Sequence, residues 1–247
     1  MAGYQAAAEY YTHIPGQVRL IPGVEFSCQW SGTTIHVVGL AVDAGHPSMA
    51  AGLERLAQAR RARGIKIADR LEAKGFYGAH EGALVEAGKS QLGRPHFAQW
   101  LVDQGHVDNH KQAFDKYLGQ GKIGDVKAFW PELREVTGWI IDSGGVAIVA
   151  HPLKYRFTRM KLRRLMVDFK LSGGQAVEVL NGRQTPDQLA QLKRLALEFD
   201  LEVSVGSDFH RDSTYGCPLG VELSSLGELR GVWRRWPNPQ QKESGVS

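Results

Sequence analysis

The sequence predicts an α/β fold. Five apolar runs typical of strands lie at residues 18–27, 34–42, 145–150, 175–180 and 201–206, and stretches with helical spacing lie between most of them. The chain has 247 residues, of which 43% are hydrophobic, so it can bury a core and can form a single α/β barrel domain. Since no run approaches the roughly 18 apolar residues of a membrane span, a soluble protein is expected.

The first part of the predicted fold, residues 1–52, contains a helix and two strands. Residues 2–13 are rich in alanine and tyrosine, and Pro15 and Gly16 end this helix before the first strand. A turn at Ser31 and Gly32 separates the strands at 18–27 and 34–42.

Residues 53–130 interrupt this pattern with charged, helical sequence, which predicts an inserted α-helical subdomain. Apolar residues recur at helical spacing after Leu53, and Gly75 is placed to end that helix. A second helix is predicted with Pro95 near its start and Gly105 at its end.

The α/β alternation resumes at Pro131 and defines a third segment, residues 131–236. Helices are predicted at 131–143, 159–171 and 186–199, between the last three strands. The polar tail at 237–247 is expected to be disordered.

Cysteine content and charge bound the class of protein. Cys28 and Cys217 are too few for a disulfide framework, and no signal peptide opens the chain, so a cytoplasmic location is expected. The net charge of +4 suits an anionic substrate but equally an ordinary basic enzyme.

Metal-ligating side chains stand at the end of, or within, several predicted strands. They are Glu25, His36, His151 and the pair Asp208 and His210. If the strands are parallel and form a barrel, their carboxyl ends meet on one rim, and these side chains come together there.

Imidazoles with carboxylates suit zinc, manganese or iron, and two such ions can hydrolyse a phosphoester through metal-bound hydroxide. Each residue alone is also compatible with a structural role, such as an ion pair for Glu25 or a helix cap for Asp208. Spacing by itself therefore leaves catalytic and structural interpretations open.

Four short motifs together resemble the PHP (polymerase and histidinol phosphatase) phosphoesterases. They are GVE at 23–25, IHVVGL around His36, AHP at 150–152 and GSDFH at 206–210, and GRPHFA at 93–98 extends the similarity into the insertion. The chain is most similar to the TrpH/YciV-like branch, which is associated with nucleoside 3′,5′-bisphosphate phosphatase and 5′-3′ exoribonuclease activity.

The resemblance implies a distorted (β/α)7 barrel with up to three divalent ions and an inserted helical cap over them. Glu25 would bridge two ions, His36 and His151 would complete the second ion's ligands, Asp208 would bind the first ion and His210 the third. A nucleotide or short RNA would be the partner, and no membrane or obligate protein partner is implied.

The chain departs from the family pattern at its start. Family members begin with a strand carrying an HxH pair and an Asp, followed by a His-Asp motif, and none of these is present here. We therefore expect an N-terminally truncated barrel that lacks its first strands and binds fewer ions, because Met1 would be an internal methionine.

Five basic side chains of the insertion are candidates for binding substrate phosphate, because arginine makes paired hydrogen bonds to phosphate and helix starts favour anions. Arg94 and His96 are the leading candidates, followed by Lys122 and by Arg60 and Arg63. Solvated surface charge is the competing interpretation, above all for Arg60 and Arg63.

Alternatives remain open. The C-terminal stretch ELRGVWRRW could stack on nucleic acid, or pack its tryptophans against the barrel. An amidohydrolase-like barrel that cleaves a C–N bond would use similar strand-end residues. The third alternative is an inactive module that binds nucleotide or RNA without turnover, and the absence of the N-terminal metal ligands favours it.

Overall fold

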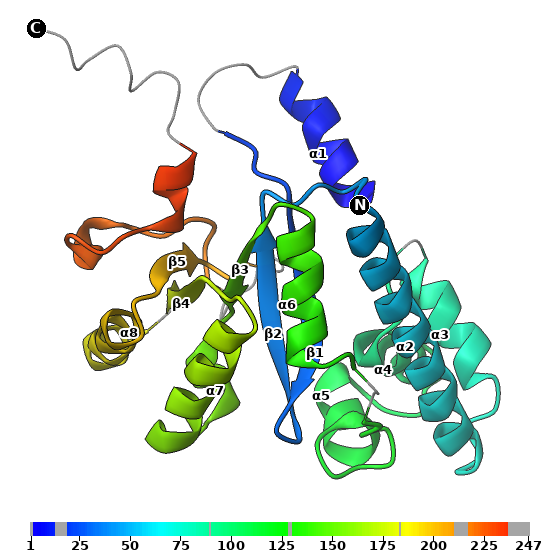
Figure 1. Ribbon diagram of the computed structural model, residues 1–247. Helices are drawn as coiled ribbons and strands as arrows, with labels where there is room; N and C mark the ends of the chain where they lie inside the picture. Colours follow the sequence, from blue (N-terminus) through cyan, green and yellow to red (C-terminus); the bar gives the residue numbers. More distant parts are fainter. Residues whose placement is uncertain are drawn as a thin grey trace, which may run out of the picture. The chain divides into compact units, whose positions relative to one another are not determined.

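The computed structural model describes residues 2–12, 19–88, 90–127, 130–182, 184–209 and 217–236. The chain separates into two units, residues 1–52 with 131–247 and residues 53–130. The predicted α/β class is confirmed, since strands and helices alternate through the first unit (Figure 1).

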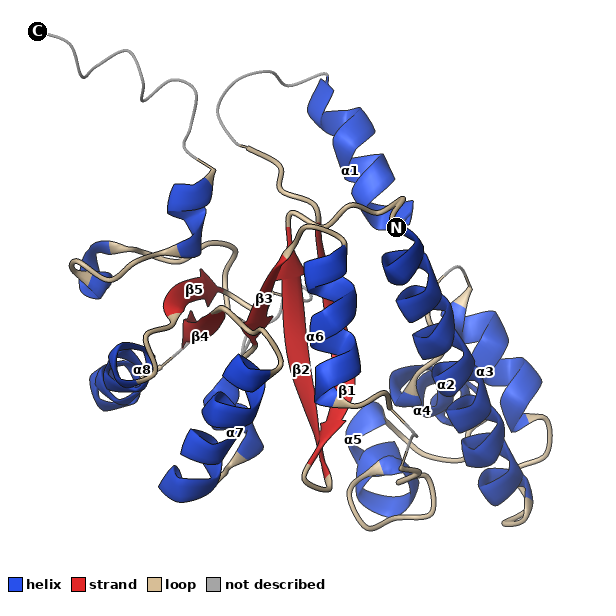
Figure 2. Cartoon of the chain, in the orientation of Figure 1, coloured by secondary structure: helices blue, strands red, loops and turns tan. Residues whose placement is uncertain are grey.

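One five-stranded sheet organises the first unit, and its strands follow one another in chain order. Figure 2 shows them in red: β1 (Gly23–Trp30), β2 (Thr33–Leu40), β3 (Val146–Val149), β4 (Ala176–Asn181) and β5 (Glu202–Gly206). β3, β4 and β5 are parallel, whereas β2 runs antiparallel to both β1 and β3.

The condition that all the strands are parallel therefore fails for β2, whereas β1 runs in the same direction as β3, β4 and β5. A two-residue turn joins β1 to β2, with Ser31 at φ 45° and Gly32 at φ 74°. Two positive φ values are the signature of a tight hairpin turn, which can connect only antiparallel strands. The first strand also begins later than expected, at Gly23.

Helices α6 (Leu133–Asp142), α7 (Arg159–Leu171) and α8 (Pro186–Glu198) belong to the same unit as the sheet. α6 contacts β1, β2 and β3, and a Cβ added at Gly39 would lie 2.9 Å from Ile140 Cγ1, so glycine allows this close approach. α7 and α8 provide the crossovers that make β3, β4 and β5 parallel.

The remaining helices of this unit are short or terminal. They are α1 (Ala2–Thr12), the 3₁₀ turns η2 (Pro152–Tyr155), η3 (Ser224–Leu226) and η4 (Val232–Arg235), and the first turn of α2 (Pro47–Glu72). Trp233 in η4 and Trp236 directly after it pack against the buried cluster that contains Val146 and Ile148. These tryptophans therefore serve the core.

The second unit is helical. It contains most of α2, followed by α3 (Ala79–Ala87), α4 (Arg94–Asp103), α5 (His110–Ala113) and the π-helical turn η1 (Phe114–Leu118). Leu71, Phe97 and Leu101 are fully buried in its core. None of the described helices of the chain is long and apolar enough to cross a membrane.

Candidate metal centre

Glu25 and His36 lie on the same face of the β1–β2 hairpin. Glu25 is paired with Val38, and Ser27 is paired with His36, so the two side chains are diagonal neighbours across the ladder. Phe26, Cys28 and Val37 alternate with them and are buried on the opposite face. The pleat therefore directs Glu25 and His36 away from the helix-covered core.

His151 joins them from the end of β3. It adopts a left-handed conformation with φ 31°, and its backbone N–H donates to a Glu178 carboxylate oxygen at 2.6 Å. The preceding N–H, of Ala150, donates to the His36 carbonyl at 3.1 Å. These bonds turn the His151 side chain towards His36 across the β2–β3 pair.

Three donor atoms converge as a result. His36 Nδ1 lies 2.9 Å from Glu25 Oε1 and 3.2 Å from His151 Nε2, and His151 Nε2 lies 3.1 Å from Glu25 Oε1. Ligand atoms about 2.1 Å from a tetrahedral ion are ~3.4 Å apart, so a small adjustment would admit a divalent ion. We call these three residues the metal cluster.

The protonation of the cluster also fits a metal. Hydrogen bonds from His151 and His36 hold the pKa of the Glu25 carboxyl well below its usual range, so the carboxylate is ionised as a ligand must be. His151 is buried, and its Nδ1 atom has no hydrogen-bond partner among the described residues. Imidazole and carboxylate donors together fit the binding of a divalent ion.

Tyr155 supports the backbone beside the metal cluster. Its hydroxyl donates to the Ala150 carbonyl and accepts from the His36 N–H, both at 2.8 Å. Burial raises the pKa of the Tyr155 phenol well above its usual range, so this group stays neutral. One side chain thus ties β2 to the end of β3 beside both histidines.

Glu178 is a buried acid that the sequence analysis did not single out. It accepts from the His151 N–H and from Asn181 Nδ2, at 2.6 and 3.1 Å, and burial raises its pKa. The available signal was an acid within the apolar strand QAVEVLNG, where it interrupts an otherwise buried run. Glu178 fixes the backbone on which His151 is presented.

The other two predicted metal ligands, Asp208 and His210, are not part of the metal cluster that the structure describes. Asp208 follows β5 with φ 52°, and its carboxylate accepts a hydrogen bond from Lys154, so it is not one of the three convergent donors. Burial first, and to a smaller extent the charge of Asp208, raises the pKa of Glu178. His210 lies outside the described residues.

Known proteins resemble most of the chain. It is 43% identical over 219 residues to a 5′-3′ exoribonuclease of Haemophilus influenzae, covering 89% of this chain and 79% of that one. It is 36% identical over 218 residues to a 3′,5′-nucleoside bisphosphate phosphatase of Chromobacterium violaceum, covering 88% and 76%. No protein-family model matches the chain.

A solved structure has a similar fold. The structure of an amidohydrolase from Chromobacterium violaceum, with bound sulfate and no metal, superposes with a TM-score of 0.75 at 36% identity, covering 87% of this chain and 75% of that one. The chain belongs to the PHP family of phosphoesterases. The resemblance inferred from the short motifs is thereby confirmed.

The phosphate-binding candidates of this PHP protein lie in the second unit, and two of them are neighbours. Arg63 Nε donates to the Val126 carbonyl at 2.9 Å, and Arg94 Nη1 donates to the Leu118 carbonyl at 3.0 Å. Burial first, and then the charge of Arg94, lower the pKa of Arg63. Asp125 lies 3.7 Å from Arg94 and partly compensates this pair.

The other three candidates have different surroundings. His96 Nδ1 accepts from the Gly93 N–H at 3.0 Å and thereby caps α4. The guanidinium of Arg60 lies 5.8 Å from the centroid of the Trp130 ring. Lys122 is exposed. Phosphate binding by these residues of the second unit therefore stays a prediction.

Proposed function

We propose that this chain is a metal-dependent phosphoesterase that removes phosphate from nucleoside 3′,5′-bisphosphates or releases nucleotides from the 5′ end of short RNA. The observation that carries this proposal is the convergence of Glu25, His36 and His151 on one point. Relatives of similar sequence are named for these two activities, which need the same hydrolysis of a phosphoester.

A divalent ion held by the metal cluster would supply an activated water and positive charge beside the phosphoryl group. Glu25 remains ionised and holds both imidazoles, while Tyr155 and Glu178 keep the histidines in place. The donor set suits manganese, zinc or iron, and manganese is our choice for the first test.

A polar cavity of about 140 Å³ adjoins the cluster. His151 lines it together with Lys154, Asn181, Gln184 and Gln188. Amide and ammonium groups can donate hydrogen bonds to phosphate and ribose oxygens, so this cavity is suited to the substrate next to the metal.

For an enzyme acting at a 5′ end, a terminal phosphate must be held while the next phosphoester reaches the metal. We propose that Arg94 and His96 hold that phosphate, with Lys122, Arg60 and Arg63 as further contributors. Arg94 lies 3.7 Å from Asp125, and Arg63 donates to the carbonyl of the next residue, Val126. The two guanidinium groups are therefore gathered in one place, which favours an anion.

A C–N hydrolase is the second candidate, because one relative of known structure is described as an amidohydrolase. A neutral amide needs no phosphate-binding arginine, so replacement of Arg94 would leave that reaction intact. A binding module has no turnover, so a change in the metal cluster would not alter any activity.

The thiols of Cys28 and Cys217 are free, which is compatible with the cytoplasmic location that we propose.

The test is phosphate release from adenosine 3′,5′-bisphosphate with added manganese, in the wild-type chain and in His151→Ala. We expect release that requires metal and disappears in the variant, while circular dichroism shows both to be folded. Absence of release by a folded, metal-loaded wild-type protein would contradict this substrate class.

A further inference from the structure

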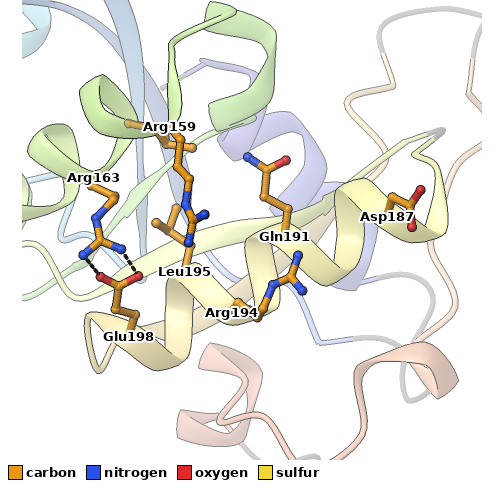
Figure 3. Close-up of a pocket in the computed structure, with 8 residues that line it drawn as sticks. Arg159, Arg163, Asp187, Gln191, Arg194, Leu195 and Glu198 are labelled. Atoms are coloured by element: carbon orange, nitrogen blue, oxygen red, sulfur yellow. Dashed lines mark hydrogen bonds and ion pairs between the residues drawn. The ribbon is translucent and has the colours of Figure 1, made fainter.

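A second, larger cavity lies away from the metal cluster, in a groove between α7 and α8. Its volume is about 550 Å³, within the range of ligand-binding clefts. Figure 3 shows Arg159 and Arg163 reaching into it from α7, and Gln191 and Arg194 from α8. We call it the α7–α8 groove.

Part of the positive charge in the groove has no ion-pair partner among the described residues. Arg163 forms an ion pair with Glu198, marked by dashed lines in Figure 3. Arg159 and Arg194 are both exposed, and neither has a side-chain partner in the described part of the chain. The remaining acid, Asp187, lies towards the start of α8, with Gln191 between it and Arg194 (Figure 3).

Helix α8 connects this groove with the metal cluster. Gln188 lines the small cavity beside His151, and Gln191 and Arg194 line the groove. Residues three apart are neighbours on a helix surface, so the three side chains follow one another along α8. From Gln188 to Arg194 the helix rises about 9 Å.

The substrates of the proposed function differ in what they need. A nucleoside bisphosphate can be bound by the metal cluster and the cavity beside it. An RNA strand that enters by its 5′ end has further phosphates beyond the scissile bond, and these require positive charge that leads away from the metal. Two uncompensated arginines along α8 and α7 meet that requirement.

We propose that the α7–α8 groove binds the phosphodiester backbone of an RNA substrate beyond the nucleotide that is released, with Arg159 and Arg194 as the phosphate contacts. This inference rests on the proposed function, because it assigns a path to the same substrate. It predicts that the groove contributes to RNA binding far more than to binding of a single nucleotide.

The test measures binding without catalysis. A short 5′-phosphorylated, 3′-fluorescein-labelled oligoribonucleotide is titrated with the full chain in EDTA, and anisotropy is followed between about 50 and 200 mM salt. The variants are Arg159→Ala, Arg194→Ala and both together. Arg134→Ala, which removes one exposed arginine from α6, is the charge-matched control for each single variant.

We expect the double variant to raise the dissociation constant about tenfold and to lower the slope of log K against log salt by about 1.4, since each single-strand phosphate contact contributes about 0.7. Arg134→Ala should reproduce the wild-type values. The KM for RNA should rise at least fivefold more than the KM for adenosine 3′,5′-bisphosphate.

Wild-type affinity and slope in the double variant would overturn the inference, whatever the activity. If Arg134→Ala loses as much affinity for RNA as each single variant does, the inference is also overturned, since the effect would then be one of net charge. Polyglutamate is titrated in the same way. If the double variant loses as much affinity for polyglutamate as for RNA, the groove binds an acidic polypeptide instead. Failure of the proposed function would appear separately, as absent hydrolysis of the mononucleotide.

Discussion

The metal cluster and the arginine pair of the second unit are both gatherings of charged side chains, yet they differ in what holds them. Glu25, His36 and His151 direct their donor atoms at one another. Arg63 and Arg94 instead donate to the backbone carbonyls of Val126 and Leu118. The first arrangement gathers side-chain donors at one point where an ion can bind, whereas the second stabilises local structure through the backbone.

This contrast teaches how to weigh candidate residues. The three donor atoms of the metal cluster face one another, and Glu25 is exposed and His36 half-buried, so an ion can reach them. Charged groups that donate hydrogen bonds to backbone carbonyls stabilise local structure, and contact with a substrate would be a second role. The following predictions test this difference.

The largest expected effect is on the metal cluster. His36→Ala removes one of three convergent donors, so we expect metal affinity and phosphate release to fall by more than about 100-fold. Isothermal titration with manganese measures the first quantity and phosphate release the second. Unchanged metal affinity in the folded variant would remove His36 from the site.

Glu178→Gln is expected to have an intermediate effect. The amide can still accept from the His151 N–H, but it lacks the charge, so metal affinity should fall about tenfold, near the lower end of changes behind a ligand. The same titration measures it, with Glu202→Gln as a control that changes an acid on the neighbouring strand. Equal effects of both variants would argue against a positioning role.

Arg94→Ala is expected to raise the KM for the nucleoside bisphosphate about tenfold, as loss of a charge-assisted phosphate contact would. It should also lower the free energy of unfolding by about 1 kcal/mol through the lost bond to Leu118. Arg70 is a matched control, because Arg70 Nη1 donates to the Ile123 carbonyl in the same unit at 3.0 Å. A KM change of equal size in Arg70→Ala would assign the effect of Arg94 to stability alone.

The smallest expected effect is on stability against pH in the metal-free protein. The folded pKa of Glu25 is depressed, so its ionised form stabilises the fold above the unfolded pKa of about 4.3, and this contribution is lost as pH falls. Melting temperatures of wild type and Glu25→Gln should therefore converge at acidic pH. Curves that remain parallel would contradict the link between Glu25 and the histidines.

Much of the fold followed from local pattern. The predicted helix at residues 159–171 coincides with α7, and the predicted strand at 201–206 differs from β5 by one residue. The direction of β2 was missed, although the two-residue turn at Ser31 and Gly32 carried the information. The barrel interpretation outweighed a turn chemistry that permits only a hairpin.

The candidate site was predictable in composition more than in geometry. The motifs identified Glu25, His36 and His151, and the structure brings them together. Glu178 escaped notice because a lone acid in a strand has no motif, and its effect depends on a neighbour 27 positions away. The α7–α8 groove was equally invisible, since Arg159 and Arg194 meet only when two helices pack.

The sequence by itself determined the class of fold, the family and the chemical types of the candidate ligands, because periodicity, turns and short motifs are local properties of the chain. Only the tertiary structure decided which donors converge. Glu25 and His151 are 126 positions apart, and their atoms meet because an antiparallel hairpin pairs with β3, a strand of the third segment. Such pairing depends on sheet order and register, which local pattern does not specify.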